Sequence, residues 1–281
     1  MPPRPAGRLA CGRFSLPLGR PLVMGVVNVT PDSFSDAGRH GTVDAAIAHA
    51  QRLIAEGADL IDIGGESTRP GAVAVTPEEE IARIVPVLDA LRDSGVPLSV
   101  DTRHPETMRA ALGHGADMIN DVAALRAPGA IDAVRESHCA VCLMHMQGEP
   151  ATMQQAPAYG DVVSEVGRFL DERVAALQAA GVARERIVVD PGIGFGKTLR
   201  HNLLLLAALD GLVAAGQPVL VGVSRKSMIG ALTGQPAQQR LAGSLAAMLA
   251  AVARGAAIVR VHDVAESRDA LRVWLAIDEV R

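Results

Sequence analysis

Seven polar residues stand near the ends of apolar, strand-like runs of this 281-residue chain. They are Asp62, Asp101, Asn120, Asp190, Ser224, Arg260 and His262. A charge beside a hydrophobic run is costly to bury unless it is paired or used. Each one alone could cap the helix that follows it, since Asp and Ser cap helices well. Capping is a poor explanation for all seven, so we expect a functional site.

The acids and the amide of this set suit a flat ligand. Asp101, Asn120 and Asp190 offer carboxylate and amide groups. An aminopyrimidinone ring presents amino and ring N–H groups that can meet one carboxylate in bidentate fashion. A competing hypothesis is that the same oxygens hold a divalent metal directly. The spacing along the chain leaves both hypotheses open.

A second group of candidates is cationic: Arg69, Lys197, Arg225, Lys226, Arg260 and His262. Arg260 and His262 are two apart on a predicted strand, so their side chains leave from the same face. Cations gathered at one site of a chain with net charge -4 indicate a bound anion. Phosphate or pyrophosphate fits best, near glycine-rich loops and helix N-termini. Taken singly, Lys197 and Arg225 are more simply interpreted as solvated surface residues.

Two tempting motifs do not support a function. The stretch 192–198 resembles a P-loop, but Pro191 stands where that pattern requires glycine. Cys139 and Cys142 are three apart in a predicted strand and face opposite sides, so neither a shared metal nor a redox disulfide is expected. We interpret His145 as structural.

Eight short apolar runs are predicted to be strands, and their starts recur about every 34 residues. They lack strict alternation, which is typical of parallel strands buried on both faces. The runs are Val23–Asn28, Asp59–Gly64, Pro97–Thr102, Met118–Val122, Ala140–Met146, Ile187–Gly192, Val219–Ser224 and Ile258–Asp263.

Helical patterns follow these runs. Thr76-Pro77 places a cap and a first-turn proline before one of them. The predicted helices are Thr42–Glu56, the helix from Pro77, Pro105–Leu112, Gly129–Glu136, Asp161–Ala180, Leu203–Ala215, Ala237–Arg254 and Ala265–Val280. Alternating strands and helices allow an open doubly wound sheet or a closed barrel. Eight strands with polar C-terminal ends favour an α/β fold of the single (β/α)8 TIM-barrel type. We expect one domain over residues 1–281, with an N-terminal extension at 1–20 that forms a hairpin across the barrel bottom.

Composition excludes several classes of protein. A pI of about 6.1 argues against a nucleic-acid or anionic-membrane surface, and 2% aromatic residues are too few for base stacking. Three cysteines do not make a disulfide framework. No apolar run reaches the roughly 20 residues that span a bilayer. We therefore expect a cytoplasmic protein that binds neither nucleic acid nor membrane.

Longer motifs add a family resemblance. Met24–Asp36 resembles the first signature loop of the dihydropteroate synthases, and Gly64–Gly71 resembles the second. Asp190–Lys197, Gly222–Ser227 and Arg260–His262 are similar to later strand-end motifs of that family. The motifs occur in order and the match runs almost end to end.

The resemblance implies a barrel that condenses 6-hydroxymethyl-7,8-dihydropterin pyrophosphate with 4-aminobenzoate. The products would be 7,8-dihydropteroate and pyrophosphate, in folate synthesis, with sulfonamides as competitors. It also implies Mg²⁺ as cofactor and a homodimer, with which the apolar late helices are compatible.

The resemblance further assigns roles by position. The pterin ring would be held by Asp62, Asp101, Asn120, Val122, Met144, Asp190, Phe195, Gly222 and Lys226. The aminobenzoate site would be lined by Thr68, Arg69, Pro70, Phe195 and Ser227. Asn28 would help bind Mg²⁺ and pyrophosphate, with Arg260 and His262 on the phosphates. Asp36, Lys226, Arg260 and His262 would be the catalytic set.

The chemistry agrees with these roles. An aniline nitrogen is neutral at pH 7 and needs no strong base, so the enzyme must activate the carbon. We hypothesise early departure of pyrophosphate, stabilised by Arg260, His262 and Mg²⁺, and a cationic methylene stabilised by Asp36. The first two signature loops are expected to exclude water. The alternatives are a methyltetrahydrofolate-binding methyltransferase barrel, a Schiff-base aldolase using Lys226, and a catalytically inactive paralogue.

Overall fold

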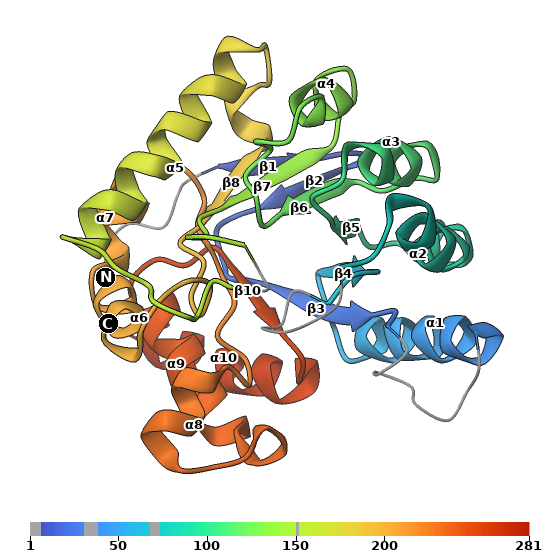
Figure 1. The fold of residues 1–281 in the computed structure, drawn as a ribbon. Helices are drawn as coiled ribbons and strands as arrows, with labels where there is room; N and C mark the ends of the chain where they lie inside the picture. The colour runs from blue at the N-terminus through green and yellow to red at the C-terminus, as the bar shows by residue number, and fades with distance from the viewer. Residues whose placement is uncertain (1–6, 31–38, 68–73, 150–151, 281) are drawn as a thin grey trace.

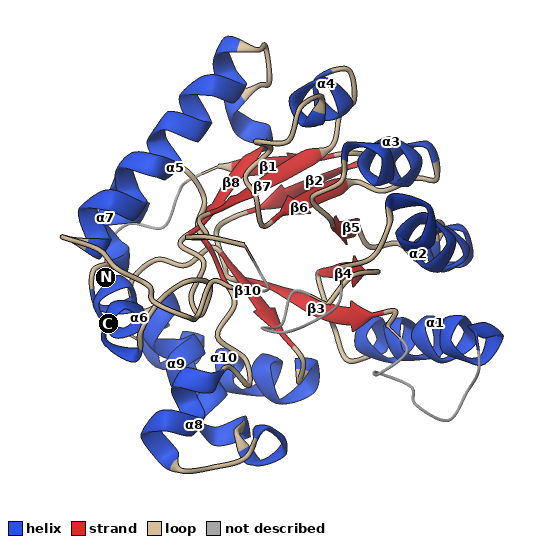
Figure 2. Ribbon diagram, viewed as in Figure 1, coloured by secondary structure: helices blue, strands red, loops and turns tan. Residues whose placement is uncertain are grey.

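The computed structural model describes residues 7–30, 39–67, 74–149 and 152–280. Parallel strands lie at the centre and helices surround them (Figure 1, Figure 2). The central sheet has eight strands. The strands are β3 (Leu22–Asn28), β4 (Leu60–Gly64), β5 (Leu98–Asp101), β6 (Met118–Asp121), β7 (Ala140–Met144), β8 (Ile187–Asp190), β9 (Leu220–Val221) and β10 (Ile258–Val261). All eight predicted strands are present, and most end one or two residues earlier than predicted.

The sheet closes into a barrel. Its strand order is β8-β7-β6-β5-β4-β3-β10-β9, and a parallel bridge between Val189 and Val219 joins the two ends. Each strand runs parallel to its neighbours, as βαβ connections require. The predicted (β/α)8 barrel is therefore confirmed.

A hairpin lies across the N-terminal end of the barrel, as predicted. It consists of β1 (Arg8–Cys11) and β2 (Phe14–Pro17). The fully buried Leu9 and Cys11 join an apolar cluster with the first inward residues of the barrel strands. Gly12, at φ +57°, donates its N–H to the carbonyl of His138 at 3.0 Å. A Cβ at Gly12 would lie 2.5 Å from Asp117 Oδ1, so only glycine fits there.

The helices lie outside the barrel and mostly begin where capping residues predict. Thr76 Oγ1 accepts the N–H of Glu79 at 3.3 Å, and Asp161 accepts that of Val163 at 3.0 Å. The helices are α1 (Arg39–Ala55), α2 (Pro77–Leu91), α3 (Pro105–Gly113), α4 (Ala130–Arg135), α5 (Val162–Ala179), α6 (Leu199–Ala207), α7 (Leu209–Ala214), α8 (Ser227–Thr233), α9 (Leu241–Val252) and α10 (Val264–Glu279). No helix in the described part of the chain is both long and apolar enough to span a membrane.

Three helix predictions need correction. The predicted helix Leu203–Ala215 begins earlier, because Thr198 and His201 form a capping box, and it divides at Ala208 into α6 and α7. The predicted helix Ala237–Arg254 is a 3₁₀ turn at Ala237–Gln239 followed by α9. Helix α8 was not predicted at all; it has seven residues, ends at Thr233 and is capped by Gly234 at φ +74°.

Candidate active site

On β4, β6, β8 and β10 the inward side of the barrel changes from apolar to polar toward the C-terminal end of the strand. Residues two apart on a strand face the same side. The lower member of each pair belongs to the buried apolar cluster beneath, and the upper member is a predicted site residue. The pairs are Leu60 and Asp62, Met118 and Asn120, Val188 and Asp190, Leu220 and Gly222, and Ile258 and Arg260. The site therefore lies at the C-terminal end of the barrel, where α/β-barrel enzymes act.

Arg260 sits among the acids rather than apart from them. Its Nε donates to Asp62 Oδ2 at 2.6 Å and its Nη2 to Asp101 Oδ2 at 3.0 Å. Asn120 Nδ2 donates to the same Asp62 oxygen at 3.1 Å. The prediction that the acidic and the cationic residues form two separate groups is therefore wrong for Arg260. The strand order explains it, because β10 neighbours β3, which neighbours β4, and the arginine reaches across the barrel.

The network leaves hydrogen-bonding capacity open. Asp62 is fully buried, yet its Oδ1 has no hydrogen-bond partner among the described residues, and neither has Ser99 Oγ. A buried acceptor without a donor costs about 1–3 kcal/mol, which a ligand N–H group would recover. The guanidinium already supplies positive charge to Asp62 and Asp101, so the arrangement favours a neutral hydrogen-bond donor over a metal at this point.

Burial shifts the protonation of this network. It raises the pKa of Asp101 to about 7, and Asp62 adds to that rise while Arg260 opposes it. Burial alone would lower the pKa of Arg260, but Asp62 and Asp101 outweigh it and raise that pKa further. Arg260 therefore stays charged at every working pH, and Asp101 is the group that titrates near neutrality.

Lys226 and Asp190 form the opposite part of the rim. Lys226 Nζ donates to the carbonyl of Ile193 and lies 4.7 Å from the centre of the Phe195 ring. Burial lowers the pKa of Lys226 to about 8, although Asp190 opposes the shift. Burial also raises the pKa of Asp190, whose Oδ1 accepts the N–H of Gly192 at 2.7 Å. A Cβ on Gly222 would lie 3.8 Å from Lys226 Nζ, so this glycine keeps the space beside the amine open.

An apolar wall completes the rim. Val122 and Met144 are each 4% exposed and form a small cluster with Met146 and Met153. Phe195 packs against this cluster with one side and carries Lys226 over its ring. A flat ring bound to the acids would therefore meet apolar side chains here, and methionine adapts well to such a surface.

Lys197 is not a solvated surface residue, and that prediction was wrong. It is 3% exposed, and its Nζ donates to His145 Nδ1 at 2.9 Å, to the His145 carbonyl at 3.2 Å and to the Phe195 carbonyl at 3.0 Å. Three acceptors match the three donors of an ammonium group. Burial nevertheless lowers the pKa of Lys197 to about 7, and burial with Lys197 nearby lowers that of His145 to about 3.

One sequence signal points to Lys197. The chain carries 27 Lys and Arg residues, of which only two are lysines, Lys197 and Lys226. The chain uses arginine for all its other basic side chains of this kind, so each of the two lysines is expected at a position that requires lysine. His145, interpreted as structural, is indeed buried and takes part in this contact.

The remaining predicted residues lie around the rim. His262 Nδ1 is 3.0 Å from Ser224 Oγ, so both sit at the C-terminal ends of neighbouring strands. Arg225 is exposed and pairs with Asp263, as predicted for a surface residue. Asn28 ends β3 beside Gly64 of β4. Ser227 is exposed at the start of α8. Asp36, Thr68, Arg69 and Pro70 lie outside the described residues.

The two cysteines of the rejected motif are separate in the fold. Cys139 belongs to the core between barrel and helices, whereas Cys142 lies inside the barrel. All three cysteines, including Cys11, are free and buried. The prediction that Cys139 and Cys142 share neither a metal nor a disulfide agrees with this placement.

A closed parallel barrel with buried carboxylates and cations at its C-terminal end defines an α/β-barrel enzyme. Residues 24–262 match the family of pterin binding enzymes. The chain is 55% identical over 271 residues to the dihydropteroate synthase of Neisseria meningitidis serogroup C, covering 95% of this chain and 96% of that one. The chain belongs to this pterin-binding enzyme family, among the dihydropteroate synthases.

Solved structures of relatives agree with the fold and carry ligands. The dihydropteroate synthase of Xanthomonas albilineans with 4-aminobenzoic acid is 56% identical, with a TM-score of 0.92 over 98% of this chain and 99% of that one. The Yersinia pestis enzyme in a sulfonamide drug complex is 47% identical, with a TM-score of 0.91 over 98% of this chain and 100% of that one.

Proposed function

We propose that this chain condenses 6-hydroxymethyl-7,8-dihydropterin pyrophosphate with 4-aminobenzoate, giving 7,8-dihydropteroate and pyrophosphate. It is a transferase of folate synthesis, as its relatives' names indicate. The observation that carries the proposal is the unpartnered Asp62 Oδ1 inside the network of Arg260, Asp101 and Asn120. It is a buried acceptor at the depth where a flat donor-bearing ring would lie.

The pterin ring binds to the acidic part of the rim. Its amino and ring N–H groups donate to buried carboxylates, while its faces contact the apolar wall. This role falls to Asp62, Asp101, Asn120, Val122, Met144, Asp190, Phe195, Gly222 and Lys226. The geometry supports the role, since two of these acids are 0% and 5% exposed and face the barrel interior.

The diphosphate of the substrate binds to Arg260 and His262. The Arg260 guanidinium has five N–H donors, and the contacts to Asp62 and Asp101 use two of them. Three donors remain for phosphate oxygens without breaking either ion pair. Arg260 thus links the pterin-binding acids to the leaving group, and charge that develops on the diphosphate is stabilised where it forms.

Mg²⁺ is proposed as cofactor beside Asn28. Asn28 is the last residue of β3 and lies at the C-terminal rim. A Cβ on Gly64 would lie 3.7 Å from the Asn28 amide oxygen, so the glycine leaves space around this oxygen. Magnesium commonly takes one or two protein oxygens, several waters and substrate phosphates, which fits a single amide ligand. When bound, it neutralises negative charge on the leaving diphosphate.

The amine component needs little activation. An aniline nitrogen is neutral at pH 7, so no base near the reacting carbon is required. We assign Thr68, Arg69, Pro70, Phe195 and Ser227 to the aminobenzoate site, where sulfonamides compete. Asp36 is assigned to the reacting methylene, together with Lys226 as the other group close to the pterin.

One assay tests the proposed function. Pyrophosphate release from the pterin substrate is measured with and without 4-aminobenzoate, in the presence of Mg²⁺. We expect release that depends on the amine. Binding of the pterin without release contradicts the proposal and indicates an inactive paralogue, and methyl transfer from methyltetrahydrofolate indicates the alternative barrel enzyme.

Assembly and location complete the proposal. We propose a homodimer in the cytoplasm. The face of α9 carries Leu245 and Leu249, which are only half-buried, and α6 exposes Leu203 and Leu204 at 40% and 42%. Such apolar surface is typical of an interface between subunits. Three free cysteines agree with a reducing compartment.

A further inference from the structure

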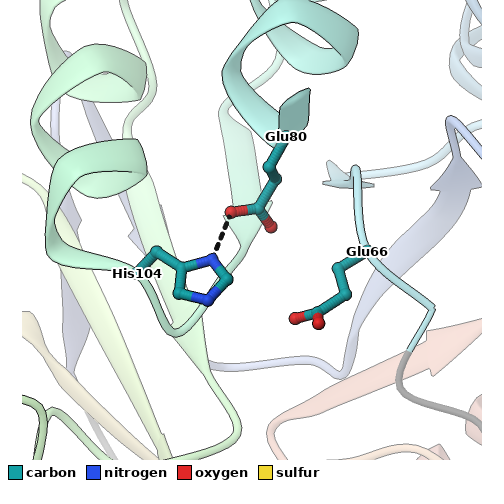
Figure 3. A group of neighbouring side chains, drawn as sticks. All are labelled: Glu66, Glu80 and His104. Carbon is teal, nitrogen blue, oxygen red and sulfur yellow. Dashed lines mark hydrogen bonds and ion pairs between the residues drawn. The ribbon is translucent and has the colours of Figure 1, made fainter. Parts of the chain in front are cut away.

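A second group of ligand-type side chains lies outside the barrel interior. Glu66 follows β4, Glu80 belongs to α2, and His104 precedes α3 (Figure 3). Each offers one ligand atom, and these atoms lie within 4.8 Å of one another. His104 Nδ1 is 3.1 Å from Glu80 Oε2, which also accepts the hydroxyl of Thr102 at 2.7 Å. None of these residues belongs to the proposed pterin, diphosphate or aminobenzoate sites.

Glu80 has an unused oxygen in a closed environment. Its side chain is 0% exposed, and its Oε1 has no hydrogen-bond partner among the described residues. Figure 3 shows this oxygen on the side of Glu80 that faces Glu66. The neighbouring Gly65 allows this packing, because a Cβ there would lie 2.9 Å from Glu80 Cγ. In folded proteins a buried carboxylate oxygen is normally paired with a cation or bound to a metal.

The surrounding charge leaves room for a cation. Arg103 donates to both oxygens of Glu66 at 3.2 Å, and also to Glu149 at 3.1 Å. One guanidinium therefore serves two carboxylates, whereas Glu80 contacts the imidazole of His104 and the neutral hydroxyl of Thr102. Glu66 Oε1 also accepts the N–H of Val75 at 3.4 Å. A carboxylate has about four acceptor sites, so Glu66 can keep these three contacts and still ligate through Oε2.

We propose that Glu66, Glu80 and His104 bind one divalent transition-metal ion, such as Zn²⁺, with water completing its coordination. An imidazole with two carboxylates suits zinc or manganese, whereas Mg²⁺ and Ca²⁺ prefer oxygen ligands alone. Bonds of about 2.0–2.2 Å require the side chains to draw together by roughly an ångström. The ion would tie the segment after β4 to α2 and α3. This site is separate from Asn28 and its proposed Mg²⁺.

The test uses metal-free full-length enzyme and Zn²⁺ alone, without pterin or pyrophosphate. Calorimetric titration is compared for the unchanged protein, Glu66→Gln, Glu80→Gln and His104→Gln. Because the buried Glu80→Gln variant could fail to fold, the other two variants carry the test independently. His114→Gln is the matched control, since His114 pairs with Asp89 at 2.8 Å on the surface. Anomalous diffraction from zinc-soaked crystals locates the ion.

We expect one equivalent of Zn²⁺ that binds between the three side chains. Loss of either Glu66 or His104 as a ligand should weaken binding on the order of 100-fold, and His114→Gln should leave it unchanged. No binding, binding unaffected in both variants, or an anomalous peak at the buried cysteines or elsewhere overturns the proposal. The three residues would then form only the His104–Glu80 and Glu66–Arg103 pairs.

Discussion

Replacing Lys197 by methionine should change how the stability of the protein depends on pH. Burial lowers the pKa of this lysine to about 7 in the folded protein, against an ordinary value of 10.5. Between these values the unfolded chain binds more protons than the folded one, so the free energy of unfolding rises with pH. At about 1.4 kcal/mol per pH unit above 7, Lys197 adds about 3 kcal/mol between pH 6 and pH 9.

The measurement is urea unfolding at several pH values for the unchanged protein and Lys197→Met. The difference in unfolding free energy, unchanged protein minus variant, should rise by about 3 kcal/mol from pH 6 to pH 9. Titrations of groups that do not contact Lys197 cancel in this difference; His145, which contacts it, does not. Arg168→Met, which removes an exposed cation, is the control and should leave the slope unchanged. A difference that is independent of pH would refute the reasoning.

Direct titration gives a second measure of the same quantity. The chain has only two lysines, so carbon-13 labelling of lysine yields two Cε signals in the magnetic resonance spectrum. We expect midpoints near 7 for Lys197 and near 8 for Lys226. A Lys197 midpoint near 10.5 would mean that the three acceptors around Nζ hold its proton against burial.

Three further substitutions test the rim. Arg260→Ala leaves two buried carboxylates without a counter-charge, so we expect about 3–5 kcal/mol less stability in urea unfolding and a large loss of turnover; unchanged turnover in a steady-state assay removes its proposed role. In the unchanged enzyme, kcat/KM for the pterin should fall below about pH 7, because the ionised carboxylate of Asp101 is lost as pH falls through its raised pKa. Asp101→Asn should abolish this fall. A pH–rate profile of the variant that keeps the fall contradicts the assignment. Gly192→Ala places a Cβ 1.9 Å from the His145 carbonyl at φ +66°, so thermal unfolding should show severe destabilisation, and a stable variant would contradict it.

The sequence predicted the fold well because the signal repeats. Eight apolar runs at a regular spacing leave few arrangements, and polar residues at their C-terminal ends distinguish the rim from the bottom. The helix boundaries were less predictable. A capping box at Thr198 starts α6 early, and Ala208 leaves the helical conformation, at φ −101° and ψ 18°, within an otherwise continuous apolar pattern.

The contacts within the site were not predictable from the same signals. Which strand a residue ends is visible in the sequence, but which side chains meet across the barrel depends on strand order and side-chain length. Arg260 illustrates this, since it reaches Asp62 and Asp101 across the barrel interior. Lys197 illustrates it too, because only the folded loop after β8 reveals three acceptors around its amine.

On several strands of the barrel, the lower inward residues contribute to stability and the upper inward residues to binding. In the lower part, Leu60, Met118 and Ile258 are fully buried and pack with the hairpin, so this end contributes apolar burial. In the upper part, the same columns present Asp62 and Arg260, and each buried acceptor without a donor costs about 1–3 kcal/mol. Apolar burial in the lower layers offsets that cost, and the cost is removed when a ligand supplies hydrogen-bond donors. The rim is therefore arranged before the ligand arrives, which is what stabilisation of a developing charge requires.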